Sequence, residues 1–384
     1  MINILHVKPF VVSFNAMPEE LYMRKALALA GRARGLTSPN PMVGAVIVKN
    51  GRIIAEGYHK KAGTPHAEAI AIEHAGDRAR GSTLYVSLEP CCHIDKRTPP
   101  CTRKIIASGI KKVVVAMNDP NPKVSGKGVK ELEAAGIRVV SGILADKAAA
   151  LNEFYIKHIK TGMPFVVLKV AMTLDGKIAT PEGESKWITG EKARTAVHAL
   201  RGSVDAILTA IGTIKADNPQ LTCRTQEDRN PVRVIIDPSL EVRSDANVLC
   251  IPPETIIVTR LARDIAAMRP EVIEKKRVLL GRGAQIIEYS GDRLDMKWLM
   301  KELGKMGIIS VLVEGGSSLN SYCLESGMVD KVMFFIAPKI IGGKSSFPAV
   351  GGETFRRLEE AYRVDNISVK KIGEDILVEG YVQK

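Results

Sequence analysis

The sequence lacks the features that mark several large classes of protein. It has no run of 18 or more apolar residues, so we expect no segment that spans a bilayer. It has neither a short-period repeat nor a low-complexity tract, which excludes collagen-like and wholly disordered chains. Its 6 cysteines in 384 residues are too few for a disulfide scaffold. The sequence therefore predicts a globular protein.

Length and charge indicate the number of domains and the kind of binding partner. A chain of 384 residues is longer than one ordinary domain and favours two. Lys and Arg number 55 against 42 Asp and Glu, a formal net charge of +13. Such an excess fits an anionic partner, which is nucleic acid, acidic lipid or a phosphorylated small molecule. Charge alone does not choose among these three.

The first residues do not have the pattern of an export signal. Their apolar stretch is short, and Lys8 and Pro9 interrupt it. Three of the six cysteines crowd into one short segment, which indicates metal binding or catalysis better than disulfides. We therefore expect a cytoplasmic protein and treat residues 1–16 as an N-terminal extension of undetermined role.

Strands alternate with helices along both halves of the chain, which predicts two layered α/β domains. The first is expected over residues 17–147, with a hairpin that turns at Asn50-Gly51. One connecting helix is expected over 148–160, inside a linker of 148–163. A second alternation begins at Phe165, so the second domain is expected over 164–384.

One group of residues in the first half has the composition of a zinc site. His66 and Glu68 stand at the start of an expected helix, Cys91 follows a proline, and Cys101 opens another expected helix. One imidazole and two thiolates suit zinc and leave a fourth position for water, whose pKa zinc lowers. Glu68 is placed to move protons between that water and a leaving amine. This H-x-E…P-C…C order is the signature of zinc-dependent deaminases.

Two alternatives remain open at this site. Cys92 competes with Cys91 as a ligand, although the cysteine directly after the proline fits the pattern better. A purely structural zinc would need a fourth protein ligand, which Cys92 or His93 could supply. A non-catalytic zinc module joined to a binding domain is therefore a second hypothesis, against which Glu68 argues.

The second half has no dinucleotide-binding fingerprint. Gly281-Arg282-Gly283 lacks the third glycine of G-x-G-x-x-G, so it does not support a Rossmann domain. Gly315-Gly316 stands between an expected strand and an expected helix, where a phosphate can approach the backbone. Alone, this pair favours a plain strand-to-helix turn.

Several motifs together resemble a known family. Nine residues separate Cys91 from Cys101, whereas deaminases of tRNA or free cytidine usually have a short C-x-x-C. From about Met17 onward the chain resembles the bifunctional deaminase/reductases of riboflavin biosynthesis. The segments that carry this resemblance are 40–44, 88–91, 97–101, 118–122, 169–177, 185–190, 212–219 and 313–316.

The resemblance implies a fold and two reactions. It implies a cytidine-deaminase-like three-layer α/β/α domain, followed by an α/β domain like that of dihydrofolate reductase. The first would remove an amine from 2,5-diamino-6-ribosylamino-4(3H)-pyrimidinone 5′-phosphate with one zinc ion per chain. The second would use NADPH to reduce the ribosyl group, giving 5-amino-6-(5-phosphoribitylamino)uracil. A homo-oligomer is expected, with neither a nucleic acid nor a membrane as partner.

The resemblance also implies roles for individual residues. The catalytic residues would be Glu68 and Asp217, and the zinc ligands His66, Cys91 and Cys101. Contacts to NADPH are implied for Ala171, Trp187, Thr213, Asp217, Gly316, Ser317, Ser318, Leu319, Asn320, Ser321 and Tyr322. Contacts to the substrate are implied for Asn40, Ser185, Arg201, Leu221, Arg224 and Glu314.

Taken one by one, several of these residues have other interpretations. Either arginine could be a surface charge, Asp217 a cap of the turn at Asn218-Pro219, and Trp187 a core residue. The chain also departs from the family pattern at two places. The loop 93–97 is one residue longer, and Pro238 stands where the family often has serine, a role that Ser239 could take. A nucleic-acid deaminase is the remaining rival, which the net charge permits and the cysteine spacing disfavours.

Overall fold

The computed structural model describes residues 18–93, 99–224, 229–261, 270–352 and 357–383. The proposed extension 1–16 and most of the loop 93–97 lie outside these ranges. The chain forms two compact units, which divide between Asn152 and Glu153, and the short segment Ser38–Asn40 groups with the second unit. Among the helices of the described residues, none combines the length and apolar composition that a membrane crossing needs.

The first unit is built on a five-stranded sheet in the order β2-β1-β3-β4-β5. Its strands are β1 (Gly44–Lys49), β2 (Arg52–Tyr58), β3 (Thr83–Val86), β4 (Lys112–Val115) and β5 (Arg138–Ser141). Its helices are α1 (Pro18–Gly31), α2 (Ala67–Ala75), α3 (Cys101–Ala107), α4 (Lys127–Ala134) and α5 (Ala145–Leu151), with a 3-10 turn η1 (Gly76–Ala79). The expected hairpin is present as β1 and β2, and β3, β4 and β5 run parallel.

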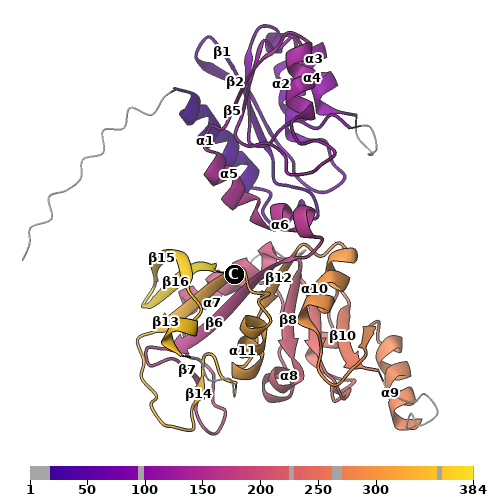
Figure 1. Cartoon of the computed structure of the whole chain (residues 1–384), viewed down its shortest axis with the longest axis vertical. Helices are drawn as coiled ribbons and strands as arrows, with labels where there is room; N and C mark the ends of the chain where they lie inside the picture. Colours follow the sequence, from indigo (N-terminus) through magenta and orange to yellow (C-terminus); the bar gives the residue numbers. More distant parts are fainter. Residues whose placement is uncertain (1–17, 94–98, 225–228, 262–269, 353–356, 384) are drawn as a thin grey trace, which may run out of the picture. The chain divides into compact units, whose positions relative to one another are not determined.

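Helices cover both faces of this sheet (Figure 1). One face packs against α2, α3 and α4 through a buried cluster that includes Ala71, Ile105 and Leu132. The other packs against α1 and α5 through Met23 and Ala148. The result is the three-layer α/β/α arrangement that strand–helix alternation predicts.

The second unit is built on a nine-stranded sheet in the order β11-β10-β9-β8-β12-β6-β13-β16-β15. Its strands are β6 (Phe165–Thr173), β8 (Ala206–Ala210), β9 (Val232–Ile236), β10 (Thr255–Arg260), β11 (Gln285–Tyr289), β12 (Ser310–Val313), β13 (Lys331–Ala337), β15 (Val364–Ile372) and β16 (Asp375–Val382). β13, β16 and β15 pair antiparallel, and the other neighbours are parallel. The short strands β7 (Lys177–Ala179) and β14 (Phe347–Pro348) pair separately.

Helices also lie on both faces of the second sheet (Figure 1). They are α6 (Glu153–Thr161), α7 (Glu191–Ser203), α8 (Ile211–Asp217), α9 (Pro270–Gly281), α10 (Met296–Lys305) and α11 (Ser317–Glu325), with 3-10 turns η2 (Asn247–Leu249) and η3 (Leu358–Glu360). One core joins α10 and α11 to the sheet through Leu299 and Cys323. The other joins α8 and α9 through Ile214 and Leu279.

The expectation of one connecting helix over 148–160 is wrong. Two helices, α5 and α6, occupy this stretch, and they break at Asn152. The buried Asn152 side chain accepts a hydrogen bond from the Met42 N–H at 2.8 Å and donates one to the Met42 carbonyl at 3.0 Å. The hydrogen bonds to a distant main chain hold Asn152 in a non-helical conformation. The helix is therefore interrupted at Asn152, although the local apolar periodicity predicts one continuous helix.

Candidate active sites

Three elements of the first unit bring the proposed zinc ligands together. His66 is the N-cap of α2, Cys91 lies in the loop after β3, and Cys101 is the first residue of α3. The His66 Nδ1 atom lies 3.5 Å from the Cys91 Sγ atom and 3.3 Å from the Cys101 Sγ atom. The three ligand atoms lie within 4.8 Å of one another. The fold therefore brings His66 together with two cysteines that lie 25 and 35 positions further along the chain.

The neighbouring backbone allows this convergence. A Cβ atom on Gly57 of β2 would lie 2.4 Å from the Ala67 carbonyl oxygen, closer than any side chain tolerates. Glycine at this position therefore lets the start of α2, which carries His66, approach the sheet closely.

Glu68 completes the site as a carboxylate that is not needed as a ligand. Its side chain is buried, and its Oε2 atom has no hydrogen-bond partner among the described residues. Burial and the nearby Cys91 raise the pKa of Glu68. One imidazole and two thiols, beside a buried carboxyl with spare hydrogen-bonding capacity, fit a zinc ion that keeps a position for water.

The two alternative ligands, Cys92 and His93, fit the proposed site less well. Cys92 is half-buried, and burial raises the pKa of its thiol, which disfavours the thiolate that a metal would bind. Neither Cys92 nor His93 belongs to the cluster of possible metal ligands found among the described residues.

The sequence analysis missed His59. Its ring stands edge-on to His66 with the centroids 5.3 Å apart, and its Nδ1 atom lies 3.2 Å from the Pro65 carbonyl oxygen. Burial lowers the pKa of His59, which favours the neutral imidazole. The only sequence feature that could have indicated His59 is its position seven residues before His66. A single histidine is not part of a periodic pattern, so the sequence did not single it out.

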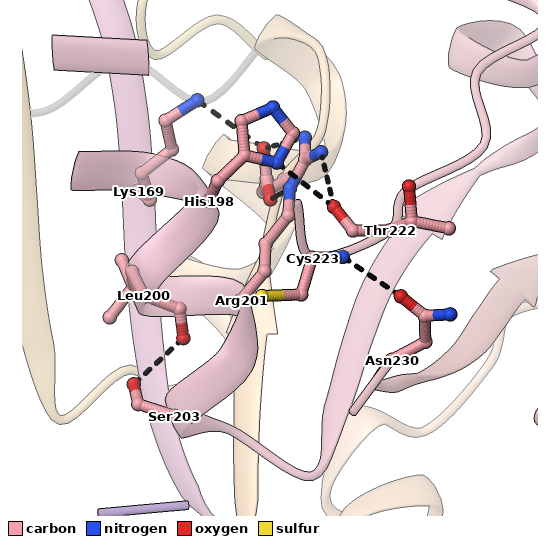
Figure 2. A network of polar contacts seen from close by, with 9 residues as sticks. Lys169, His198, Leu200, Arg201, Ser203, Thr222, Cys223 and Asn230 are labelled. Carbon is pink, nitrogen blue, oxygen red and sulfur yellow. Dashed lines mark hydrogen bonds and ion pairs between the residues drawn. The ribbon is translucent and has the colours of Figure 1, made fainter. Parts of the chain in front are cut away.

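The second unit holds a buried ionic network around Glu314, which follows β12. The Arg201 Nε and Nη2 atoms lie 2.6 and 3.0 Å from the two Glu314 carboxylate oxygens. The Lys169 Nζ atom, from β6, lies 3.3 Å from Glu314 Oε2. Figure 2 shows Lys169, His198 and Arg201 turned toward a common centre, with the Thr222 carbonyl bound by both His198 and Arg201.

The charges of this network do not cancel. Burial alone would raise the pKa of Glu314, but Arg201 and Lys169 outweigh it and lower that pKa to about 2. One carboxylate therefore faces two buried cations, which leaves a net positive charge. The sequence indicated no individual role for Lys169, which is 145 residues from Glu314, or for His198, which lies about one helical turn before Arg201 on α7. A net positive, largely desolvated cluster suits an anionic group of a ligand.

The segment expected to bind a phosphate of NADPH is the start of α11, which begins at Ser317 after Gly316. Ser318 is exposed, whereas Ser317, Leu319, Asn320 and Ser321 are buried, so the expected contacts of these four with a cofactor stay predictions. Tyr322 donates its hydroxyl hydrogen to the Leu294 carbonyl, and the Arg293 guanidinium covers its ring at 4.3 Å.

Asp217 is paired with a lysine. It ends α8, and its Oδ1 atom lies 3.1 Å from the Lys186 Nζ atom. The turn that follows is made by Asn218, whose φ is 41° and whose carboxamide oxygen accepts from the Asn247 N–H at 2.9 Å. Asp217 is thus turned toward the 185–190 segment, which carries Trp187, and the lysine was not foreseen from the sequence.

Trp187 is an exposed residue, so its alternative interpretation as core is wrong. It is 64 % exposed, with the Arg194 guanidinium 4.8 Å from its ring centroid and its carbonyl bonded to the Lys339 Nζ atom at 2.7 Å. An exposed ring, contacted by Arg194 and with its main chain held by Lys339, is available to stack on a ligand.

The remaining proposed residues differ in how far a ligand can reach them. Leu221 is buried, with a φ of 53°. Those that are exposed or half-buried are Asn40, Ala171, Ser185, Thr213, Arg224 and Ser239. Burial lowers the pKa of His198, and the positive charges of Arg201 and Arg224 lower it further, so Arg224 acts electrostatically on the Glu314 network. The roles of Leu221, Asn40 and Arg224 in substrate binding stay predictions.

Comparison with known proteins agrees with both halves of this description. The cytidine and deoxycytidylate deaminase zinc-binding region matches residues 17–117, and the RibD C-terminal domain matches residues 164–378. The riboflavin biosynthesis protein RibD of Actinobacillus pleuropneumoniae is 45 % identical over 369 residues, which cover 96 % of each chain. The chain belongs to the RibD family.

Solved structures give the same result. RibD of Acinetobacter baumannii (form 1) superimposes with a TM-score of 0.85 at 38 % identity, covering 96 % of this chain and 99 % of that one. The Thermotoga maritima deaminase/reductase superimposes with a TM-score of 0.82 at 39 % identity, covering 95 % and 99 %. The chain is therefore a bifunctional, zinc-dependent deaminase and NADPH-dependent reductase of riboflavin biosynthesis, and the two expected α/β folds are confirmed.

Proposed function

We propose that His66, Cys91 and Cys101 hold the zinc ion of the RibD deaminase half and that Glu68 is its proton carrier. The observation that carries this assignment is the convergence of the three ligand atoms beside a buried carboxyl whose Oε2 has no partner among the described residues. The substrate is proposed to be 2,5-diamino-6-ribosylamino-4(3H)-pyrimidinone 5′-phosphate.

The residues divide the deamination between them. When bound, zinc supplies a water molecule that is activated at neutral pH. Glu68 would accept a proton from that water and pass it to the amine nitrogen, which leaves the ring as ammonia while the water oxygen stays on the ring carbon. Burial suits Glu68 to this exchange, because it raises the pKa of the carboxyl toward the working pH.

In the reductase half, we propose that the Glu314 network binds the substrate and that the start of α11 binds phosphate of NADPH. The network presents two cations and one carboxylate, which can hold a phosphate and the hydroxyls of a ribosyl group. NADPH supplies the hydride that reduces C1′ of that group, giving 5-amino-6-(5-phosphoribitylamino)uracil. Trp187 and Ser318 are exposed on the segments proposed to meet the cofactor.

Asp217 is proposed to be the catalytic carboxylate of the reduction, with Lys186 fixing its orientation. Replacing Asp217 by Asn removes the negative charge and keeps the shape. Reduction of the deaminated substrate is expected to fall by about 10²-fold or more, because the charge that forms at C1′ loses its counter-ion. NADPH consumption measures this fall. Ammonia release should be unchanged, and loss of both activities would instead make Asp217 structural.

The partners are proposed to be phosphorylated small molecules and further copies of the chain. The positively charged Glu314 network is a compact, half-buried cluster, unlike a strip of surface charge that tracks nucleic acid. The edge strand β15 exposes Ile367 and Val369, which supports association with a second chain. The use of NADPH supports a cytoplasmic location.

Replacing Glu314 by Gln tests the reductase site directly. The change leaves Arg201 and Lys169, whose side chains are only 16 % and 14 % exposed, without their counter-ion, so the reductase domain is expected to lose up to about 3–5 kcal/mol of unfolding free energy. Reduction should be lost with it, while ammonia release continues. Urea unfolding and NADPH consumption measure the two effects.

The matched control is Glu274→Gln, which breaks an exposed ion pair with Arg277 in the same unit. It should change the unfolding free energy by less than about 1 kcal/mol. If Glu314→Gln were as mild as this control, the network would not be the buried ionic centre described above.

A further inference from the structure

We propose that Glu89 is the positioning residue of the zinc centre, because its carboxylate fixes the segment that carries Cys91. This inference rests on the proposed ligand set of His66, Cys91 and Cys101. Glu89 itself does not belong to the cluster of possible metal ligands. The burial of this carboxylate, two residues before a proposed zinc ligand, must therefore have a reason other than metal binding.

The Glu89 carboxylate is fully engaged by main-chain donors. Its side chain is buried, at 3 % exposure. Oε2 accepts hydrogen bonds from the N–H groups of Asp119 at 3.1 Å and Gly126 at 3.0 Å, and Oε1 accepts one from Val129 at 3.2 Å. Every partner is a donor, which an acceptor-only carboxylate matches and a carboxamide does not.

These bonds join two stretches that are far apart in the sequence. Asp119 and Gly126 belong to the loop after β4, and Val129 lies in the first turn of α4. The carboxylate thus ties the whole 119–129 stretch, 30 to 40 residues away, to the zinc-ligand loop. Without it, three buried or half-buried N–H groups would lose their partner, which costs free energy at each.

The main chain on either side of Glu89 is held as well. The Glu89 N–H donates to the Met117 carbonyl at 3.0 Å, at the end of β4. The Cys91 carbonyl accepts from the Thr102 N–H at 3.3 Å, and the Cys91 Sγ atom lies 3.5 Å from the Cys101 nitrogen. The segment 89–91 is therefore fixed to β4, α4 and α3, and the Glu89 carboxylate supplies the hydrogen bonds to α4 and its N-cap.

Gly128 provides independent evidence that this attachment is close. A Cβ atom at Gly128 would lie 2.2 Å from the Pro90 carbonyl oxygen and 3.2 Å from Glu89 Oε1. Only glycine allows the first turn of α4 to rest on the Glu89-Pro90 peptide. An alanine there would push α4 away from the zinc-ligand loop without altering the carboxylate.

The two residues therefore give two separate ways to loosen Cys91. In Glu89→Gln one carboxylate oxygen becomes an NH₂ group that faces an N–H donor. In Gly128→Ala the carboxylate remains and the helix is displaced. Outer residues that orient a metal ligand typically change metal affinity by about 10–100-fold. Both variants should thus release zinc faster by about that factor, although neither touches the metal.

The test uses the full-length, zinc-loaded protein and a colorimetric chelator in excess. The rate of zinc transfer is compared among wild type, Glu89→Gln, Gly128→Ala and Glu133→Gln, an exposed acidic residue of the same helix. We expect zinc release about 10–100-fold faster in the first two variants and unchanged in the control. NADPH consumption on deaminated substrate should stay at the wild-type level in all of them, which shows that the reductase half is folded.

Zinc release within twofold of wild type in Gly128→Ala and Glu89→Gln would overturn the proposal, even if either variant were less stable to heat. If Glu89→Gln does not fold, Gly128→Ala decides by itself. The ligand set is checked separately with Cys91→Ser. Retention of zinc by Cys91→Ser would overturn the ligand set and this proposal with it, whereas zinc loss there and normal release in the other two variants would overturn only the role of Glu89.

Discussion

Cys91→Ser protein is expected to be purified without zinc and to release no ammonia, while it still oxidises NADPH with deaminated substrate. A serine hydroxyl does not ionise at neutral pH, so the site keeps one imidazole and one thiolate. Zinc binding worth about 10–16 kcal/mol is shared among the ligands, so losing one should weaken it by at least about 10²–10³-fold. Metal analysis of the protein, with the two activity assays, measures the result.

Cys92→Ser is the matched control, because Cys92 is the adjacent thiol and stands outside the ligand cluster. It should keep about one zinc per chain and most of its deaminase activity. The opposite pattern, with zinc retained in Cys91→Ser and lost in Cys92→Ser, would move the ligand to Cys92. Loss of NADPH oxidation in Cys91→Ser would contradict the independence of the two units.

Glu68→Gln should keep its zinc and lose ammonia release by about 10²–10⁴-fold, the usual contribution of a general acid–base group. The carboxamide fills the same buried space, but it can neither accept a proton from water nor return one to the leaving nitrogen. The measurement is the rate of ammonia release at matched zinc content.

Glu73→Gln serves as the control, since Glu73 lies on the same helix and is exposed. It should behave as wild type in both zinc content and rate. If Glu68→Gln released ammonia within a few fold of wild type, Glu68 would not be the proton carrier. If it lost zinc instead, Glu68 would be a ligand or a support for one.

Local signals were sufficient for much of the first unit. Asn50-Gly51 predicted the β1–β2 hairpin, and the proline before Cys101 agrees with the start of α3. The order of His66, Glu68, Cys91 and Cys101 predicted that His66, Cys91 and Cys101 converge, because metal chemistry restricts both residue type and sequence order. These features depend on a few neighbouring residues, which is why the sequence reveals them.

Features made by distant partners were not accessible in this way. The break at Asn152 depends on Met42, 110 residues away, and the Glu314 network draws Lys169 from a strand 145 residues earlier. The bonds of Glu89 reach 30 to 40 residues along the chain. Each of these side chains is polar and at least half-buried, and its identity is explained only by groups that the fold brings to it.

The most direct test of the account follows both products from one sample of zinc-loaded protein. The diaminopyrimidine ribosyl phosphate is supplied with and without NADPH, and ammonia and NADPH are measured over time. We predict ammonia release without NADPH, and NADPH oxidation that begins only after ammonia has formed. Absence of ammonia from protein that carries its zinc would contradict the proposed substrate and the proposed deaminase site.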